Sequence, residues 1–145
     1  MLVGEKLHFY YVGLAAGHKT GTRGKGLAFL RKDGYVSRRA DGDALGLLTT
    51  IPVSLPLRPE TRLVLNATTF DAGSIRVSVL DAKGQPLAGY ATDNCQLVQG
   101  DKTTLPVRWN GHDCLPDLGG EPICLRFELR KAEIYGYELA REGTP

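Results

Sequence analysis

The feature that most constrains the fold of this chain is a period-two alternation of apolar and polar residues in short segments. It is clearest at residues 62–68, 74–81 and 122–130. The apolar residues that would share one face of each strand are Leu63, Leu65, Ala67, Ile75, Val77, Val79, Ile123, Leu125, Phe127 and Leu129. Those expected on the opposite faces are Arg76, Ser78, Cys124, Arg126, Glu128 and Arg130. Such alternation is typical of antiparallel strands that face the core on one side and water on the other.

Turn sequences separate the alternating segments. Asp33-Gly34, between residues 27–32 and 35–38, predicts a hairpin, and Asp71-Ala72-Gly73 and Asp81-Ala82-Lys83-Gly84 predict two further turns. Residues 133–140 are expected to form another strand, and residues 115–118 at most one short helical turn. Many short strands with frequent turns are typical of a sandwich or barrel. We therefore predict an all-β fold, an antiparallel β-sandwich of jelly-roll-like form.

The start of the chain follows a different pattern. Residues 7–13 are apolar on both faces, as expected for a strand that is covered twice, and residues 27–30 are their expected partner across a Gly-rich basic loop at 18–26. We predict a β-hairpin over residues 1–31 and a β-sandwich domain over residues 32–145. Because two strands alone are marginal in water, we expect the hairpin to be covered by the sandwich or by a second copy of the chain.

Composition limits the classes of partner. The chain has 145 residues, of which 42% are hydrophobic, and 18 Lys and Arg stand against 16 Asp and Glu. A net charge of +2 is too slight to indicate a nucleic-acid partner. No run approaches the ~20 apolar residues of a membrane helix, and the first residues lack the pattern of a signal peptide. We expect neither a nucleic-acid nor a membrane partner, and the composition leaves the compartment open.

Motifs that carry chemistry in other proteins are incomplete here. The Gly-rich segment at residues 17–26 has neither the GxxxxGK[ST] nor the GxGxxG spacing of phosphate-binding loops. His8, His18 and His112 form no i, i+4 pair, and no serine lies in a GxSxG motif. The carboxylates lie mostly in turns or on outward strand faces, as Glu128 does, rather than as a buried glycosidase pair. We therefore predict no catalytic residue.

Three cysteines, Cys95, Cys114 and Cys124, cannot all pair with one another, and none lies in a CxxC or a zinc-type spacing. A reactive thiol or a Cys114–Cys124 bridge is one interpretation. The other, which we favour, is that all three are free and have no chemical role.

The aromatic residues suggest a carbohydrate site formed by Trp109, Tyr90 and Arg108. The apolar C–H face of a sugar stacks on an aromatic ring, and an arginine can contact its hydroxyl groups. The alternative is that Trp109 shares a strand face with Leu105 and Val107 and packs in the core.

A structural calcium ion is the one cofactor that the sequence suggests. Asp93 and Asp101, together with nearby backbone carbonyl groups, supply the oxygen ligands that calcium prefers. No other cofactor is expected.

Several segments resemble a family when they are taken in order. Residues 31–37 (RKDGYVS) resemble an RRDGFVS segment of certain bacterial glycosidase-like proteins, and residues 75–90 resemble their VELLDADGKPIPGY segment. The pieces that follow in the same order are Asp93-Asn94-Cys95, Gly100-Asp101, Val107-Arg108-Trp109 and residues 125–135. Over residues 7–139 the chain resembles the five-bladed propeller glycosidases of the invertase and arabinanase type.

The resemblance implies a place in such a protein. Residues 7–30 match the last strands of the propeller, and residues from about 32 onward match the β-sandwich that follows it. The catalytic carboxylates of that family lie in earlier blades, so the resemblance implies no catalytic residue in this chain. Proteins of this family are often exported.

Three functions are compatible with these observations. The first is a non-catalytic accessory domain that supports an upstream propeller or binds glycan weakly. The second is a self-standing carbohydrate- or protein-binding module, and the third is a small hydrolase with an unrecognised site. The expected partners are a glycan and either an upstream propeller or a second copy of the chain.

Overall fold

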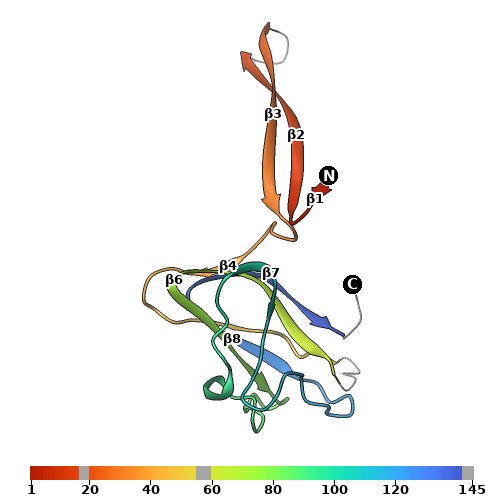
Figure 1. The fold of residues 1–145 in the computed structure, drawn as a ribbon, viewed down its shortest axis with the longest axis vertical. Helices are drawn as coiled ribbons and strands as arrows, with labels where there is room; N and C mark the ends of the chain where they lie inside the picture. The colour runs from red at the N-terminus through yellow and green to blue at the C-terminus, as the bar shows by residue number, and fades with distance from the viewer. Residues whose placement is uncertain (17–19, 55–59, 142–145) are drawn as a thin grey trace. The chain divides into compact units, whose positions relative to one another are not determined.

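The computed structural model describes residues 1–16, 20–54 and 60–141 of the chain (Figure 1). The fold is all-β, as predicted, and every strand pairing in the described part is antiparallel. The short helical turn lies at η1 (Thr92–Asn94) and not at residues 115–118. Within the described ranges, no helix is long and apolar enough to cross a membrane.

Two compact units make up the chain, Met1–Val36 and Ser37–Pro145. The predicted division between residues 31 and 32 therefore falls inside the first unit. Each unit has its own sheet, so each is described by itself.

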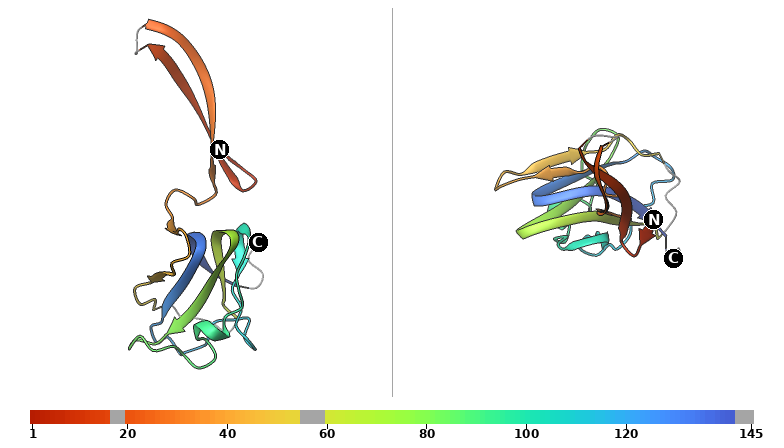
Figure 2. Two further views of the ribbon diagram at one scale, coloured as in Figure 1. Left: turned by 90° about the vertical axis from the view of Figure 1, so that its left-hand side faces the viewer. Right: turned by 90° about the horizontal axis from the view of Figure 1, so that it is seen from above.

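The first unit is a three-stranded sheet of β1 (Leu2–Val3), β2 (Lys6–Ala16) and β3 (Thr20–Arg31), in that order. We call β2 and β3 together the N-terminal hairpin; its two strands run side by side in Figure 2. The predicted pairing of residues 7–13 with residues 27–30 is confirmed by the register, in which Leu7 lies opposite Leu30 and Tyr10 opposite Leu27.

The loop predicted over residues 18–26 is wrong from residue 20 onward, because these residues are part of β3; residues 17–19 lie outside the described part. One glycine of β3 makes room for a side chain across the hairpin. A Cβ atom on Gly26 would lie 2.3 Å from Cζ of Tyr11, so the tyrosine ring occupies the space that the glycine leaves.

The hairpin predicted at Asp33-Gly34 is also wrong, although a turn is present. Asp33 has a φ of 54°, and the Gly34 N–H donates to the Arg31 carbonyl oxygen at 3.0 Å. This turn lies near the end of the first unit, and the residues on its two sides do not pair with each other. β3 pairs with β2, and β4 (Arg38–Ala40) pairs with residues 132–134, far along the chain.

The second unit is a five-stranded sheet. Its remaining strands are β5 (Gly46–Thr49), β6 (Arg62–Leu80), β7 (Asp101–Pro106) and β8 (Cys124–Ala140), in the order β4-β8-β6-β7, with β5 also on β8. The long strands β6 and β8 lie side by side in Figures 1 and 2. Because hydrogen bonds join the strands into one sheet, the sandwich or jelly-roll form stays a prediction.

β6 confirms the predicted apolar alternation but not the turn at Asp71-Ala72-Gly73. Its buried residues include the predicted Leu63, Leu65, Ala67, Ile75, Val77 and Val79; Ser78, predicted on the outer face, is buried as well, as are Asn66 and Leu80. The strand continues through residues 71–73, with a shift of register against β8 between Thr69 and Ser74. Gly73 is required there, because a Cβ atom would lie 2.1 Å from the Lys131 carbonyl oxygen.

β8 contains both the 122–130 segment and the strand predicted at residues 133–140. Its buried side chains change phase along the strand, from Leu125, Phe127 and Leu129 to Ala132 and Ile134. The change occurs at Lys131, whose φ of 43° marks the irregular residue opposite the β6 bulge. One buried face is thus kept along both strands despite the interruption.

The connections after β6 complete the core. The turn predicted at residues 81–84 is confirmed: Oδ1 of Asp81 accepts hydrogen bonds from the backbone N–H groups of Lys83 and Gln85. The buried residues that these connections add are Tyr90, Cys95, Val98, Val107, Trp109 and Leu115.

Candidate functional site

The predicted sugar platform at Trp109 and Tyr90 is corrected by the structure, because both side chains belong to the core. Trp109 is 1% exposed and its Nε1–H donates to the Val77 carbonyl oxygen at 2.8 Å. Tyr90 is 8% exposed and packs edge-on against Trp109, with 5.1 Å between the ring centroids. A ring in this setting contributes to stability and presents no face to a sugar.

The third member of the predicted platform lies apart from this packing. Arg108 is exposed and its Nε atom is 3.6 Å from Oδ1 of Asp113. The Tyr90 hydroxyl donates to the Cys114 carbonyl oxygen at 3.1 Å, and the Tyr90 ring stacks on His112. Burial is the main cause that raises the pKa of Tyr90, and the Cys114 thiol adds to it. Tyr90, Trp109 and Arg108 do not form one exposed site.

The two carboxylates suggested for calcium have separate partners. Asp93, in η1, lies 3.9 Å from Nη1 of Arg76, and Asp101, at the start of β7, accepts a hydrogen bond from the Thr68 hydroxyl at 2.9 Å. In the described ranges, no three His, Cys, Asp or Glu side chains gather as metal ligands would. The calcium site stays a prediction.

The three cysteines are free, as favoured, and the Cys114–Cys124 bridge is not formed. Cys95 is buried: its thiol accepts from the Val77 N–H at 3.2 Å and donates to the Gln96 carbonyl oxygen at 3.3 Å. Burial raises the pKa of the Cys95 thiol, and this effect outweighs the opposing effects of Val77 and Arg76. A thiol in this state is a structural group rather than a nucleophile.

A polar groove on the outer face of β6 and β8 is the candidate binding site. The register places Ser74 opposite Arg130 and Arg76 opposite Glu128, so these four side chains share one face of the sheet. Together with two leucines they line a groove of about 290 Å³. We call it the arginine groove.

Two exposed leucines form its apolar walls. Leu45 comes from the loop between β4 and β5. Leu97 precedes Val98, which forms an isolated β-bridge with Ile75. Leu97 lines the groove together with Arg76, the residue that follows Ile75. Both leucines are about half exposed.

The charges in the groove are unequal. Among the described residues that line it, Glu128 is the one carboxylate, and Oε1 of Glu128 accepts a hydrogen bond from the Thr92 hydroxyl at 2.9 Å. Arg76 has only the distant contact with Asp93, and Arg130 makes no ion pair with any carboxylate of the described residues. Arginine guanidinium groups without a close carboxylate are suited to bind one from a ligand.

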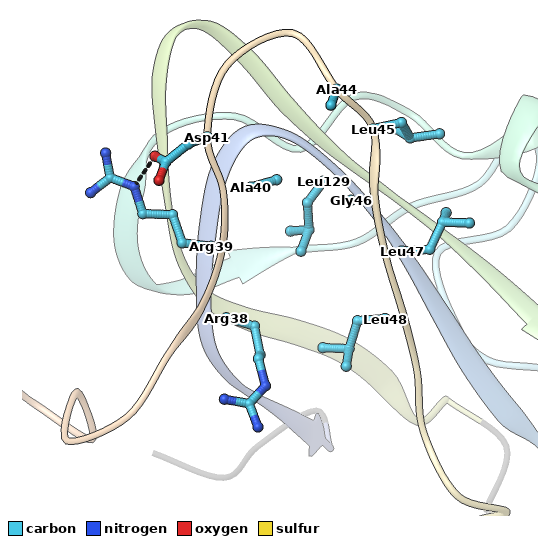
Figure 3. Close-up of a pocket in the computed structure, with 10 residues that line it drawn as sticks. All are labelled: Arg38, Arg39, Ala40, Asp41, Ala44, Leu45, Gly46, Leu47, Leu48 and Leu129. Carbon is cyan, nitrogen blue, oxygen red and sulfur yellow. Dashed lines mark hydrogen bonds and ion pairs between the residues drawn. The ribbon is translucent and has the colours of Figure 1, made fainter.

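A second cavity, of about 250 Å³, lies between β4, the following loop, β5 and β8 (Figure 3). Its apolar part includes Ala40, Leu48 and Leu129, and Leu45 lines this cavity as well as the arginine groove. On its rim, Figure 3 shows the Arg39 guanidinium joined to the Asp41 carboxylate. Arg38 also lines this cavity and donates to the Ser37 carbonyl oxygen at 3.4 Å. Among the described residues, only one arginine here is without a close carboxylate partner, against two in the arginine groove, so this cavity is the weaker candidate for a charged ligand.

The sequence contained part of the signal for the arginine groove. The alternation set Arg76, Glu128 and Arg130 on outward strand faces, but it could not show that the two strands pair side by side. Leu45 and Leu97 were not predicted as site residues, because their positions depend on loops that the alternation does not describe.

Comparison of the chain with models of protein families, with curated proteins and with solved structures found no match.

Proposed function

We propose that this chain is a non-catalytic accessory β-sandwich domain whose N-terminal hairpin packs against a separate β domain. The observation that carries the proposal is the exposure of large apolar side chains on both faces of that hairpin. The second unit provides the contrast, because its strands bury the apolar residues that alternate along them.

The first face of the hairpin carries Tyr10, Val12, Leu27 and Phe29. Residues opposite each other in an antiparallel pair share a face, so the pairs Tyr10–Leu27 and His8–Phe29 lie on one side. Tyr10 is 70% exposed and Phe29 57%. An apolar surface of this kind is typical of an interface.

The second face is apolar as well. Phe9 lies opposite Ala28 and Tyr11 opposite Gly26, and both aromatic side chains are about half exposed. Between the pairs Leu7–Leu30 and Gly13–Gly24, the second face carries only apolar or aromatic residues and glycines, whereas the first face also carries Lys25 opposite Val12. Large apolar side chains exposed on both faces favour a strand pair that is covered on both sides.

The edges of the hairpin support the same role. Within the described part, β3 pairs only with β2, and β1 covers β2 only at Lys6 and Leu7. The N–H and C=O groups along the outer edge of β3 are therefore available to another strand. Addition of such a strand would supply main-chain hydrogen bonds together with burial of side chains.

The apolar surface of the hairpin offers a gain comparable in size to the cost of association. Full burial of a large apolar side chain stabilises by about 1.5–3 kcal/mol, and the hairpin exposes seven such side chains: Phe9, Tyr10, Tyr11, Val12, Leu14, Leu27 and Phe29. The loss of freedom on association reduces the gain by an estimated 4–15 kcal/mol. Full burial of all seven is worth at most about 10–20 kcal/mol, which is of the same order as this cost, and the main-chain hydrogen bonds of an added strand would contribute as well.

The assignment of the partner rests on the sequence resemblance. In the propeller glycosidases that the chain resembles, the strands matching residues 7–30 belong to the last blade, so the proposed partner is an upstream propeller. The catalytic carboxylates of those proteins lie in earlier blades, which supports a non-catalytic role for this chain.

The experiment is a binding titration between this chain and the polypeptide encoded in frame upstream of Met1, produced separately. We expect a complex that is lost in the double variant Tyr10→Asp, Phe29→Asp, because two charges would be buried at the interface. Ile51→Asp is the matched control, since Ile51 is an exposed apolar residue of the second unit.

Three results would contradict the proposal. They are an upstream reading frame without a β domain, a complex that survives the double variant, and turnover of a glycoside by the purified chain. Self-association of the chain, lost in the same double variant, would instead assign the hairpin to a second copy and overturn the propeller as partner.

A further inference from the structure

We infer that the arginine groove binds an acidic sugar, a saccharide that carries a carboxylate among its hydroxyl groups. This role goes beyond the docking of the N-terminal hairpin and does not depend on it. The groove lies on the second unit, whereas the hairpin belongs to the first.

The carboxylate would bind between Arg76 and Arg130. These residues project from neighbouring strands at adjacent register positions, since Arg76 lies opposite Glu128 and Arg130 lies two residues beyond it on β8. A guanidinium group offers parallel N–H donors that match the two oxygens of a carboxylate. Neither arginine is held by a close ion pair within the described residues.

The hydroxyl groups of a sugar would find partners in the same groove. The carboxylate of Glu128 accepts hydrogen bonds, and its orientation is fixed by the bond from the Thr92 hydroxyl. The Ser74 hydroxyl both donates and accepts. Leu45 and Leu97 supply apolar walls against which the C–H groups of a sugar ring can pack.

The presence of Glu128 also favours a sugar over other anions. Glu128 can accept hydrogen bonds from the hydroxyl groups of a sugar, and neither a glutamate peptide nor a phosphate polymer offers such groups. Among the described residues that line the groove, none is an aromatic side chain on which a nucleobase could stack.

The test uses the full chain and three soluble probes: trigalacturonic acid, a neutral trisaccharide of galactose, and a short polyglutamate peptide. Binding is measured by calorimetry at low ionic strength. We expect trigalacturonic acid to bind, the other two probes to bind at least about tenfold more weakly, and added salt to weaken the binding.

Variants then locate the site. Arg76→Ala and Arg130→Ala should each weaken binding of trigalacturonic acid by about tenfold or more, because each removes a charge-assisted hydrogen bond. Glu128→Gln should not weaken binding of the carboxylate, since an amide oxygen still accepts from a hydroxyl group. Lys83→Ala, which removes one positive charge from the turn after β6, is the matched control and should leave the affinity unchanged.

Each of the remaining outcomes overturns the inference. No binding of trigalacturonic acid, or binding that is unchanged in both arginine variants, would exclude the groove as the site. Equal binding of polyglutamate would show a general anion surface, and equal binding of the neutral trisaccharide would show that the carboxylate is not recognised.

Discussion

The two units of this chain use apolar residues in opposite ways. In β6 of the second unit, apolar and polar residues alternate, and Leu63, Leu65 and Val77 are fully buried. In β2 of the first unit, apolar residues follow one another, and Tyr10, Tyr11 and Val12 are each more than half exposed. Alternation therefore marks a strand that completes a core within its own unit. A strand with apolar residues on both faces is typical of one that is covered by residues from outside its unit.

The largest difference between the units should appear when one aromatic ring is removed from each. Trp109→Ala should lower the free energy of unfolding by about 3–5 kcal/mol, because it leaves a cavity in the core and an unpaired Val77 carbonyl. Tyr10→Ala should change it by less than about 0.5 kcal/mol, because Tyr10 is exposed in the hairpin. Urea denaturation of both variants measures the two effects.

These two substitutions can also contradict the account. A small effect of Trp109→Ala, combined with a new ability to bind sugars, would restore the platform interpretation. A large effect of Tyr10→Ala in the monomeric chain would show that the hairpin is packed within the chain itself.

A smaller difference is expected for glycine substitutions in the two sheets. Gly73→Ala should cost about 1–3 kcal/mol, because its Cβ atom would press on the carbonyl oxygens of Arg130 and Lys131 at the bulge. Gly13→Ala in β2 is the matched control, since a Cβ atom there meets no atom within 4 Å. Thermal unfolding would compare them, and equal melting temperatures would show that the bulge tolerates a side chain.

Local alternation predicted the strands well and their ends poorly. The buried residues of β6 and the 125–129 part of β8 follow from period two, which depends only on neighbouring residues. The strand reversals predicted at Asp71-Ala72-Gly73 and Asp33-Gly34 do not occur, because pairing at these places depends on distant partners. The same local residues can form either a β-bulge within one strand or a turn that reverses the chain. Only the pairing with β8 decides which of the two forms.

The candidate site was less predictable than the fold. Trp109 was chosen because it is aromatic and has polar neighbours, yet its indole N–H is satisfied inside the core by the Val77 carbonyl. Three residues of the arginine groove, Arg76, Glu128 and Arg130, were assigned to outward faces correctly. These side chains lie next to one another because the register of β6 against β8 places Arg76 opposite Glu128. That register cannot be derived from either strand alone.

The central claim is that the second unit contains the stable core, and we propose that a partner covers the N-terminal hairpin. Amide hydrogen exchange of the full-length chain, at a concentration where light scattering shows a monomer, tests this most directly. The amides of β6 and β8 should be the most protected, and those along the outer edge of β3 should exchange many times faster. Equal protection of β3 and β6 in the monomer would contradict the account.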